Sequence, residues 1–306
     1  MPREYTLFGK TKIFFDSKSR PRIRIGKYPR SRQKIKIDYK PEVKIRYGHG
    51  QKPLESIARL IYPHEENILK GLERIKSYQN YLGEIKFLPS DNQYLPYWQQ
   101  TFFSPLDGAT IYTIIADRKP VRFYEIGSGF STMFARKAIT DHNLATKIMS
   151  IDPEPRAEID KISDSILRSR LEDIDLSVFD KLEVGDFIFL DGSHRSFQNS
   201  DVTVFFLEVL PKLPKGVIIG VHDILLPHDY PSSWSHRWYS EQYLLGAFWL
   251  GLGEKFIPIF PNYYTFKKYP DQVRQALPLK VIDGYENSDF FSEFSFGGTG
   301  MFFIVE

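Results

Sequence analysis

The sequence contains no cysteine, which excludes disulfide bridges, thiolate zinc sites and cysteine nucleophiles. This absence leaves the redox compartment open, because a chain without thiols is stable in either one. Long hydrophobic runs are also missing: the longest, residues 243–253, has about half of the roughly 20 residues that a spanning helix needs. Charges occupy the start of the chain, where a signal peptide has its apolar core. We therefore expect a cytoplasmic protein without a transmembrane segment.

The chain does contain enough apolar material for a full core. Of its 306 residues, 42% are hydrophobic and 15% are aromatic, which excludes global disorder and allows one large domain or two modest ones. The net charge of +3 hides an uneven distribution. Residues 1–60 carry 17 Lys and Arg against 5 Asp and Glu, whereas the other 246 residues carry 24 against 33. This split indicates a basic appendage on an acidic globular body.

The hydrophobic pattern divides the chain into three parts. Residues 1–52 form a basic, β-rich extension, because three short runs alternate apolar and cationic residues with the period of a strand: Arg22–Ile25, Lys34–Ile37 and Val43–Tyr47. Residues 53–103 form a linker region that begins with helical periodicity. Residues 104–306 form the main domain.

Within the main domain, apolar strand-like runs alternate with helical segments. The expected strands are Val121–Ile126, Ile148–Asp152, Asp186–Asp191, Gly216–Asp223, Phe256–Phe260 and Met301–Val305. The expected helices are Ser104–Asp117, Ser131–Thr140, Ser196–Leu210, Ser240–Leu250 and Asp271–Ala276. Apolar strands separated by helices indicate a doubly wound α/β fold, with a mostly parallel sheet covered on both faces. Such sheets bind ligands beyond the carboxyl ends of their strands.

The sharpest motif is the turn Glu125–Gly129, which follows the first of these strands. Gly127 and Gly129 let the backbone turn sharply and approach a ligand, and the next helix adds oriented N–H groups. A dinucleotide turn requires a third glycine where this chain has Thr132. Glu125 would also repel a pyrophosphate, whereas a cationic ligand such as S-adenosylmethionine (SAM) tolerates a carboxylate.

The next strand ends at Asp152, 25 residues after Gly127. An acid at this position accepts hydrogen bonds from both ribose hydroxyls of a bound nucleoside. The alternative is a tight turn without a ligand, in which Asp152 caps the segment that follows.

At these residues the chain resembles class I SAM-dependent methyltransferases, and among them the group related to macrocin O-methyltransferase and cephalosporin hydroxylase. The resemblance covers roughly Phe102 to Val305, with the segments FFSPLDGATIYTII, FYEIGSGFST, IDPEP, LEDIDLSVFDKLEVGDFIFLDGSH, VIIGVHDILLPHDYPSSW and SEQYLLGAF in order. It implies a Rossmann-like methyltransferase fold whose seven-stranded sheet has an antiparallel last strand. Nothing before Phe102 belongs to it.

The resemblance also implies which residues bind the cofactor. The glycine turn would face the methionine part of SAM, Asp152 the ribose and Asp173 the adenine. The full set of expected cofactor-binding residues is Glu125, Gly127, Ser128, Gly129, Asp152, Asp173 and Asp191.

Two further strand ends carry polar clusters, Asp191–His194 and His222–Asp223. Imidazoles and carboxylates at adjacent strand ends can bind a divalent cation or move a proton. The resemblance implies that Asp191 and Asp223 hold magnesium and that His194 is the general base. The chain departs from those relatives at His222, where they have Glu. Because magnesium prefers oxygen ligands, His222 weakens the expectation of magnesium or shifts it toward a transition metal.

The expected catalytic residues are therefore His194, Asp191 and Asp223, and the expected metal ligands are Asp191, His222 and Asp223. Structural roles stay open for each of them. Asp191 could cap the following helix or contact the cofactor, and His222 and Asp223 could bond to each other. The Pro-rich, aromatic segment Leu226–Trp234 follows directly and is suited to covering an acceptor.

The function expected from all this is SAM-dependent O-methylation of a hydroxyl on a sugar, a glycan or a glycosylated small molecule. One alternative is a non-catalytic SAM-binding subunit whose basic N-terminal arm binds an anionic partner. Another is an NAD-dependent oxidoreductase, which Thr132 disfavours. The opposite charges of arm and body also favour association between copies of the chain.

Overall fold

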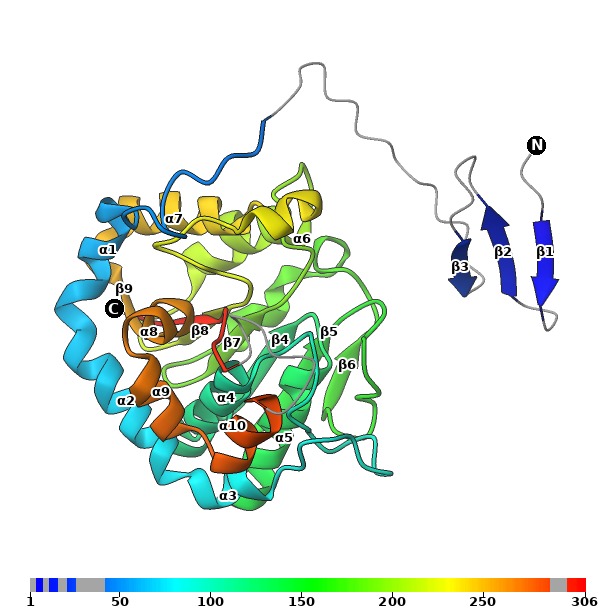
Figure 1. The fold of residues 1–306 in the computed structure, drawn as a ribbon, viewed down its shortest axis with the longest axis horizontal. Coiled ribbons are helices and arrows are strands. Elements are labelled where there is room, and N and C mark those ends of the chain that lie inside the picture. Colours follow the sequence, from blue (N-terminus) through cyan, green and yellow to red (C-terminus); the bar gives the residue numbers. More distant parts are fainter. Residues whose placement is uncertain (1–3, 8–10, 16–20, 26–41, 287–295) are drawn as a thin grey trace. The chain divides into compact units, whose positions relative to one another are not determined.

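The computed structural model describes residues 4–7, 11–15, 21–25, 42–286 and 296–306. The chain divides into two units, Met1–Glu42 and Val43–Glu306 (Figure 1). In the first unit, three strands form an antiparallel sheet in chain order: β1 (Glu4–Leu7), β2 (Thr11–Phe15) and β3 (Pro21–Ile25). The strand expected at Arg22–Ile25 is thus confirmed, and the run Lys34–Ile37 lies outside the described residues.

The strand expected at Val43–Tyr47 is wrong. Among the described residues this segment pairs with no strand and is bonded to a loop instead. The backbone N–H of Arg46 donates to Asp229 Oδ2 (3.0 Å), and the N–H of Asp229 donates to the carbonyl of Tyr47 (3.0 Å). The alternating pattern predicts an extended backbone correctly, but it does not distinguish a strand from a segment held by a loop.

The second unit is built on a seven-stranded sheet in the order β6-β5-β4-β7-β8-β10-β9. Its strands are β4 (Arg122–Ile126), β5 (Lys147–Ile151), β6 (Ser165–Leu167), β7 (Phe187–Leu190), β8 (Ile218–Val221), β9 (Phe256–Pro261) and β10 (Met301–Val305). β10 is antiparallel to both neighbours, and the other pairs are parallel. The expected Rossmann-like fold is therefore confirmed. The edge strand β6 was not predicted, because three residues are too few to show a period.

The α-helices are α1 (Glu55–Ile61), α2 (Glu65–Ser77), α3 (Gln79–Glu84), α4 (Pro105–Arg118), α5 (Phe130–Asp141), α6 (Asp201–Val204), α7 (Glu241–Leu252), α8 (Asn262–Lys268), α9 (Pro270–Ala276) and α10 (Leu279–Glu286). α6 continues as a π-helical turn, Phe205–Val209, and a 3-10 turn, Leu210–Lys212. Further 3-10 turns are Tyr62–His64, Leu171–Asp173, Leu176–Lys181, Ser232–Arg237 and Gly253–Lys255.

The helix expected from Ser196 begins later, at Asp201. Ser200 caps it, because its side chain accepts a hydrogen bond from the backbone N–H of Thr203 (3.2 Å). The residues between β7 and this cap are therefore free to form the loop that carries His194.

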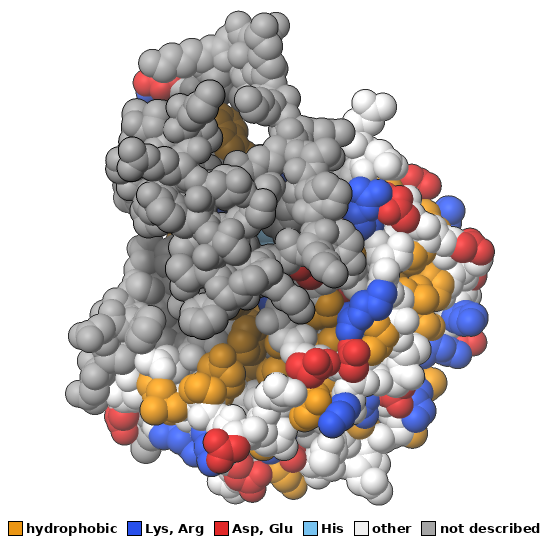
Figure 2. Space-filling view, turned by 90° about the vertical axis from the view of Figure 1, so that its right-hand side faces the viewer, with side chains coloured by type: hydrophobic (Ala, Val, Ile, Leu, Met, Phe, Trp, Pro, Cys, Tyr) orange, Lys and Arg blue, Asp and Glu red, His pale blue; other side chains and the backbone are white. Residues whose placement is uncertain are grey.

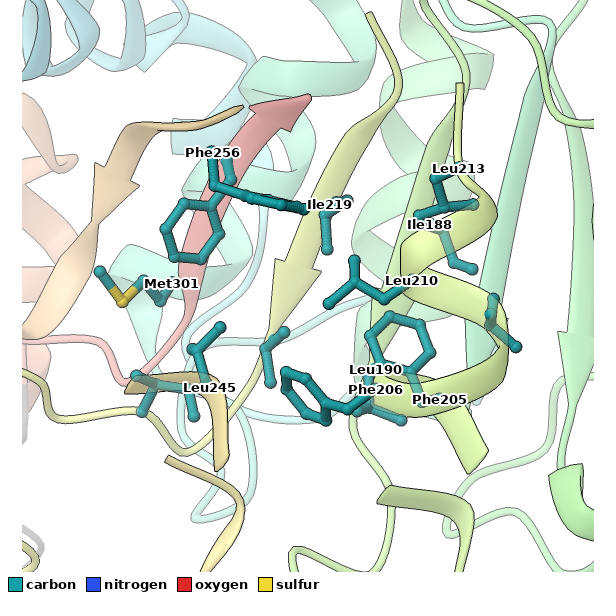
Figure 3. Packing of buried hydrophobic residues seen from close by; sticks show 14 of the residues in the cluster. Ile188, Leu190, Phe205, Phe206, Leu210, Leu213, Ile219, Leu245, Phe256 and Met301 are labelled. Atoms are coloured by element: carbon teal, nitrogen blue, oxygen red, sulfur yellow. The ribbon is translucent and has the colours of Figure 1, made fainter. Parts of the chain in front are cut away.

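Both faces of the sheet are buried. α4 and α5 pack on one face, where alternate strand residues such as Phe123 and Phe189 form a core with helix residues such as Phe134. α1, α6 and α7 pack on the other face (Figures 1 and 3). There Ile188 and Ile219 meet the residues that follow α6 and those of α7. Because the central strands β4, β7 and β8 are buried on both sides, they can present polar side chains to a ligand only at their ends.

The surface of the second unit carries charges of both signs. On the face shown in Figure 2, lysine and arginine side chains alternate with acidic ones among the residues that the view describes. Within the described ranges, no helix is long and apolar enough to cross a membrane.

Candidate active site

The four strands β4, β5, β7 and β8 are parallel neighbours, so their carboxyl ends meet at one edge of the sheet. The glycine turn follows β4, Asp152 follows β5, and the two polar clusters follow β7 and β8. Backbone hydrogen bonds join each end to the next: Gly127 N to Ile151 O (3.0 Å), Asp191 N to Ile126 O (2.8 Å) and His222 N to Leu190 O (2.9 Å). This edge is the candidate active site.

The two glycines of the turn have different roles. Gly127 has φ +78°, and a Cβ there would lie 1.9 Å from the carbonyl oxygen of Asp191. Gly127 therefore lets the turn pack directly against the end of β7. Gly129 has φ +152°, but a Cβ there would meet no protein atom closer than 3.6 Å, at Ala157 N. A Cβ on Gly129 would therefore contact Arg156 and Ala157 without a clash, so the backbone conformation rather than close packing favours glycine here.

Glu125 lies fully buried behind the turn. Its carboxylate accepts hydrogen bonds from the hydroxyls of Ser131 (2.9 Å), Thr132 (2.5 Å) and Ser150 (2.6 Å). Burial raises the pKa of Glu125 to about 7, against the lowering effect of these three bonds. Thr132, which replaces the third glycine, also accepts from the N–H of Gly129 (3.0 Å). Glu125 thus fixes the turn, and its contact with a ligand stays a prediction.

Asp152 holds the other side of the turn. Its Oδ2 accepts from the backbone N–H (2.7 Å) and the hydroxyl (3.2 Å) of Ser128, and its Oδ1 accepts from the N–H of Glu154 (2.7 Å). An ionised carboxylate has about four acceptor sites, so these bonds leave capacity for a ligand hydroxyl. The ribose contact of Asp152 stays a prediction.

Asp173 is placed differently from the other candidates. It ends the 3-10 turn Leu171–Asp173, is exposed, and accepts a hydrogen bond from Arg170 Nε (2.7 Å). Among the described residues, the Asp173 side chain forms no hydrogen bond or ion pair with the strand-end residues, and its expected place beside an adenine stays a prediction.

His194 is the centre of the acceptor side. Its Nε2 lies 3.4 Å from Asp191 Oδ1 and 3.5 Å from Asp223 Oδ2. Its Nδ1 lies 2.5 Å from Oε1 of Glu241, the first residue of α7. The three residues predicted to be catalytic are therefore in direct contact, together with an acid that the sequence did not identify.

His222 is the second imidazole of the cluster. Its Nδ1 lies 3.4 Å from Asp191 Oδ1 and 3.6 Å from Asp223 Oδ1, and its Nε2 lies 3.2 Å from Asp107 Oδ2. Asp107 is fully buried near the start of α4 and also accepts from the backbone N–H groups of Thr299 (2.9 Å) and Gly300 (2.8 Å). Each imidazole thus has one nitrogen on a buried supporting acid and the other on Asp191 and Asp223.

His194 and Asp223 also have an uncommon backbone conformation. They have φ +62° and +54°, in the left-handed region that non-glycine residues rarely adopt. Such a conformation costs on the order of 1–2 kcal/mol for each residue. Five other non-glycine residues among those described share it, Lys119 at the end of α4 among them, so the strain alone assigns no function to either residue.

The charges of the neighbouring acids determine whether the two histidines of the cluster are protonated. Burial lowers the pKa of His194, but the charges of Glu241, Asp223 and Asp191 outweigh it and raise the pKa to about 9. Burial likewise opposes the raised pKa of His222, which Asp191, Asp223 and Asp107 cause. Burial raises the pKa of Asp191, but the two imidazoles hold it at about 2. At neutral pH both histidines therefore carry a positive charge.

The same geometry tests the expected metal. Asp191 Oδ1 is buried between the two imidazoles without a hydrogen-bond partner, which is compatible with a cation. However, in the part of the chain that the structure describes, no three His, Asp or Glu side chains converge as a metal site requires. Imidazole nitrogens are also poor ligands for magnesium. The cluster therefore suits protonated imidazoles better than it suits magnesium, and the proposed mechanism involves no metal.

Sequence reasoning missed Asp107 and Glu241 as members of the site. Both lie in segments that carry the family resemblance, FFSPLDGATIYTII and SEQYLLGAF, so an acid inside each segment was available as a signal. Asp107 lies in the first turn of α4, where an acid also stabilises a helix. Ser104 donates to it (2.6 Å) rather than capping the backbone of α4, so this acid instead positions His222.

Comparison with known proteins identifies a domain in this part of the chain. Residues 124–224 match the family model described as "Methyltransferase domain". The matched stretch begins in β4 and ends just after Asp223, so it contains both the glycine turn and the acceptor cluster. The match confirms the expectation of a methyltransferase for this part of the chain. No protein with a curated description matches the sequence.

Several solved structures show a distant likeness. The SAH-bound methyltransferase PaMTH1 of Podospora anserina is 16% identical, with 71% of this chain and 93% of that chain covered and a TM-score of 0.38. A structure of cmcI with Mg and SAM is 16% identical, with 52% and 68% covered and a TM-score of 0.32. Mycolic acid cyclopropane synthase CmaA1, complexed with SAH and CTAB, is 14% identical, with 76% and 96% covered and a TM-score of 0.30.

Proposed function

We propose that this protein is a SAM-dependent O-methyltransferase that acts on a hydroxyl of a sugar, a glycan or a glycosylated small molecule. One observation carries the proposal. The glycine turn and the imidazole–carboxylate cluster lie side by side at one sheet edge, with Gly127 packed against the backbone of Asp191. A cofactor held by the turn would thus present its reactive group to His194 and its acids.

The turn suits SAM better than a dinucleotide. Thr132 stands where a dinucleotide turn needs glycine. Glu125 places a buried carboxyl group behind the turn, and its charged form would repel a pyrophosphate. When bound, SAM supplies an already activated methyl group, so the protein has to position the acceptor oxygen and remove its proton.

His194 is the proposed base. It can accept the hydroxyl proton at Nε2 only after losing the proton that it shares with Asp191 and Asp223 at neutral pH. Glu241 holds the proton on Nδ1 and fixes the orientation of the ring. We therefore expect kcat/KM to rise with pH up to about 9, the pKa of His194. A rate that falls from pH 7 to 9, while the protein stays folded, would argue against His194 as the base.

Asp191 and Asp223 are the proposed acceptor-positioning residues. Asp223 Oδ2 lies 3.5 Å from His194 Nε2 and can accept a hydrogen bond from a sugar hydroxyl, whereas Asp191, whose Oδ1 is buried between the imidazoles, can offer only its Oδ2. Thr299 donates to Asp223 Oδ1 (3.1 Å), which leaves Oδ2 facing the imidazole. A sugar hydroxyl held there is within reach of the base.

The N-terminal unit suggests a second candidate function, binding of an anionic partner. It is a separate unit, Met1–Glu42, and belongs to the 60-residue stretch with 17 basic and 5 acidic residues. Deletion of residues 1–42 should remove binding to heparin or nucleic acid that weakens steeply with salt. Unchanged binding by the truncated protein would refute this function, and a change in oligomeric state would favour self-association.

Melting temperature tests the proposed function against its alternatives. We expect S-adenosylhomocysteine (SAH), at 100 times its dissociation constant, to add about 2.7 kcal/mol of stability. NAD should add none. A shift with NAD and none with SAH would favour the oxidoreductase. A shift with SAH without methyl transfer to any of a panel of sugars and glycans would favour the non-catalytic subunit.

A further inference from the structure

An aromatic cluster lies directly beside His194. Its members are Tyr230, Trp234, Tyr239 and Tyr243, with ring centroids 5.9 Å apart for Tyr230–Trp234, 5.8 Å for Trp234–Tyr239 and 5.7 Å for Tyr230–Tyr243. The ring of Tyr239 lies 4.4 Å from the imidazole of His194. Aromatic faces next to a catalytic residue suit the packing of a flat acceptor ring.

Two arginines lie over this cluster. The guanidinium carbon of Arg237 is 4.3 Å from the ring centroid of Trp234 and 5.5 Å from that of Tyr239, and that of Arg195 is 5.3 Å from Tyr239. Tyr239 therefore contacts His194 on the one hand and both guanidinium groups on the other. One aromatic ring separates the proposed base from a pair of positive charges.

Neither arginine has a carboxylate partner among the described residues. Other arginines of the chain pair closely with acids: Arg122 with Asp186 (2.8 Å), Arg136 with Asp164 (2.6 Å) and Arg170 with Asp173 (2.6 Å). Among the described residues, Arg195 donates only to the carbonyls of Ser193 (2.7 Å) and Arg237 (3.0 Å). Within the described chain, the guanidinium of Arg237 has aromatic contacts but no hydrogen bond.

The backbone holds these groups in place. Arg195 bridges the loop after β7 and the 3-10 turn Ser232–Arg237 through its bond to Arg237 O. Ser240 N donates to the carbonyl of His194 (2.9 Å), and its hydroxyl accepts from Ser196 N (2.9 Å). The two arginines and the proposed base are therefore fixed in one assembly of two loops.

We propose that Arg195 and Arg237 form an anion subsite that binds a carboxylate of the methyl acceptor while the acceptor hydroxyl lies at His194. A planar guanidinium matches a carboxylate in shape and can donate two parallel hydrogen bonds to it. The acids around His194 disfavour a negative group beside the imidazole. The carboxylate of the acceptor therefore sets the direction in which the acceptor binds. This inference rests on the proposed function and names its substrate class, a hydroxylated ring that bears a carboxylate.

The test compares two ligands that differ in this group, D-glucuronate and D-glucose. Binding of each to the full-length protein is measured by saturation-transfer NMR at pH 7, with and without SAH. We expect glucuronate to bind at least about ten times more tightly than glucose, a difference of about 1.4 kcal/mol. Arg237→Gln and Arg195→Gln should each reduce this preference severalfold, and Arg237→Lys should retain part of it.

Arg274→Gln is the matched control, because Arg274 also lies over an aromatic ring, Phe296 (4.6 Å), but on α9. It should keep the full preference, and the melting temperature of every variant verifies that it is folded. The inference is overturned if the wild-type protein binds the two sugars equally or binds neither. It is also overturned if folded Arg237→Gln keeps the preference for glucuronate. Failure of SAH to bind overturns the proposed function instead, because the sugar comparison is also made without SAH.

Discussion

Two pairs of acids lie at the same sheet edge, one buried and one partly buried, and they differ in their partners. Beside the glycine turn, Glu125 accepts from three hydroxyls and Asp152 from a hydroxyl and two backbone amides. On the acceptor side, Asp191 and Asp223 face the imidazoles of His194 and His222. The first group is held by neutral donors and the second by groups that can carry charge.

The difference shows in the pKa values. Burial raises the pKa of Glu125 to about 7, because neutral hydroxyls compensate little of the cost of a buried charge. Burial also opposes ionisation of Asp191, yet the imidazoles hold its pKa at about 2. Neutral donors thus build a fixed turn for a ligand, whereas charged donors build a cluster that exchanges protons. The comparison supports the proposal that the first group binds the cofactor and the second carries the chemistry.

The largest expected effect is on turnover. His194→Ala should lower kcat by roughly 100- to 10,000-fold, the usual contribution of a general base. SAH affinity should stay near the wild-type value, because none of the hydrogen bonds of Glu125 and Asp152 involves His194. Steady-state rates with an identified acceptor and calorimetry with SAH measure the two quantities. Near wild-type turnover between pH 6 and 9 would make the histidine structural.

The next largest expected effect is on stability, at the contact between the glycine turn and Asp191. Gly127→Ala should lower the free energy of unfolding by on the order of 3 kcal/mol, because its Cβ would overlap the Asp191 carbonyl at a positive φ. Gly185→Ala is the control: its φ is +87°, but a Cβ there has nothing within 4 Å. It should cost only about 1–2 kcal/mol of backbone strain. Equal losses in urea denaturation would contradict the close packing of the turn against β7.

Stability should also depend on pH in a definite direction. Glu125, with its pKa raised from 4.5 to about 7, stabilises the fold below pH 4.5 and loses this contribution as the pH passes 7. His194, raised from 6.5 to about 9, contributes fully below pH 6.5 and loses this as the pH passes 9. The free energy of unfolding should therefore fall from pH 5 to pH 9. Denaturation at pH 5, 7 and 9 measures it, and a rise over this range would contradict the proposed partners.

The smallest expected effect is a change in stability, and it compares one acid from the glycine turn with one acid from the acceptor side. Glu125→Gln at pH 6 should change the free energy of unfolding by less than about 1 kcal/mol, because the surrounding hydroxyls can rotate to satisfy an amide. Asp191→Asn removes a charge that His194 and His222 face, and should cost about 3 kcal/mol. Similar losses for both variants would show that the partners of the two acids do not matter.

Much of this site could be predicted from the sequence, because strand ends are visible in it. Each apolar run ends in a polar segment, at Glu125–Gly129, Asp152, Asp191 and His222. In a parallel sheet these ends lie at one edge, so the runs predict where the polar residues meet. The positions of these residues therefore follow from local patterns and one topological rule.

The supporting acids could not be predicted in the same way. Asp107 and Glu241 lie near the starts of α4 and α7, where an acid is common for reasons of helix stability alone. Only the packing of these helices on opposite faces of the sheet brings the two acids to His222 and His194. The protonation of the cluster follows from these contacts, so it too was hidden in the sequence.

Calorimetric titration of wild-type protein with SAH at pH 7 tests the central claim most directly. The glycine turn and the remaining acceptor capacity of Asp152 predict one binding site per chain with a micromolar dissociation constant. Gly129→Val should bind no SAH, because valine rarely adopts the backbone conformation of the turn at φ +152° and its branched side chain would press on Arg156 and Ala157. Absence of binding to the wild type at millimolar SAH would contradict the account, and so would undiminished binding to folded Gly129→Val.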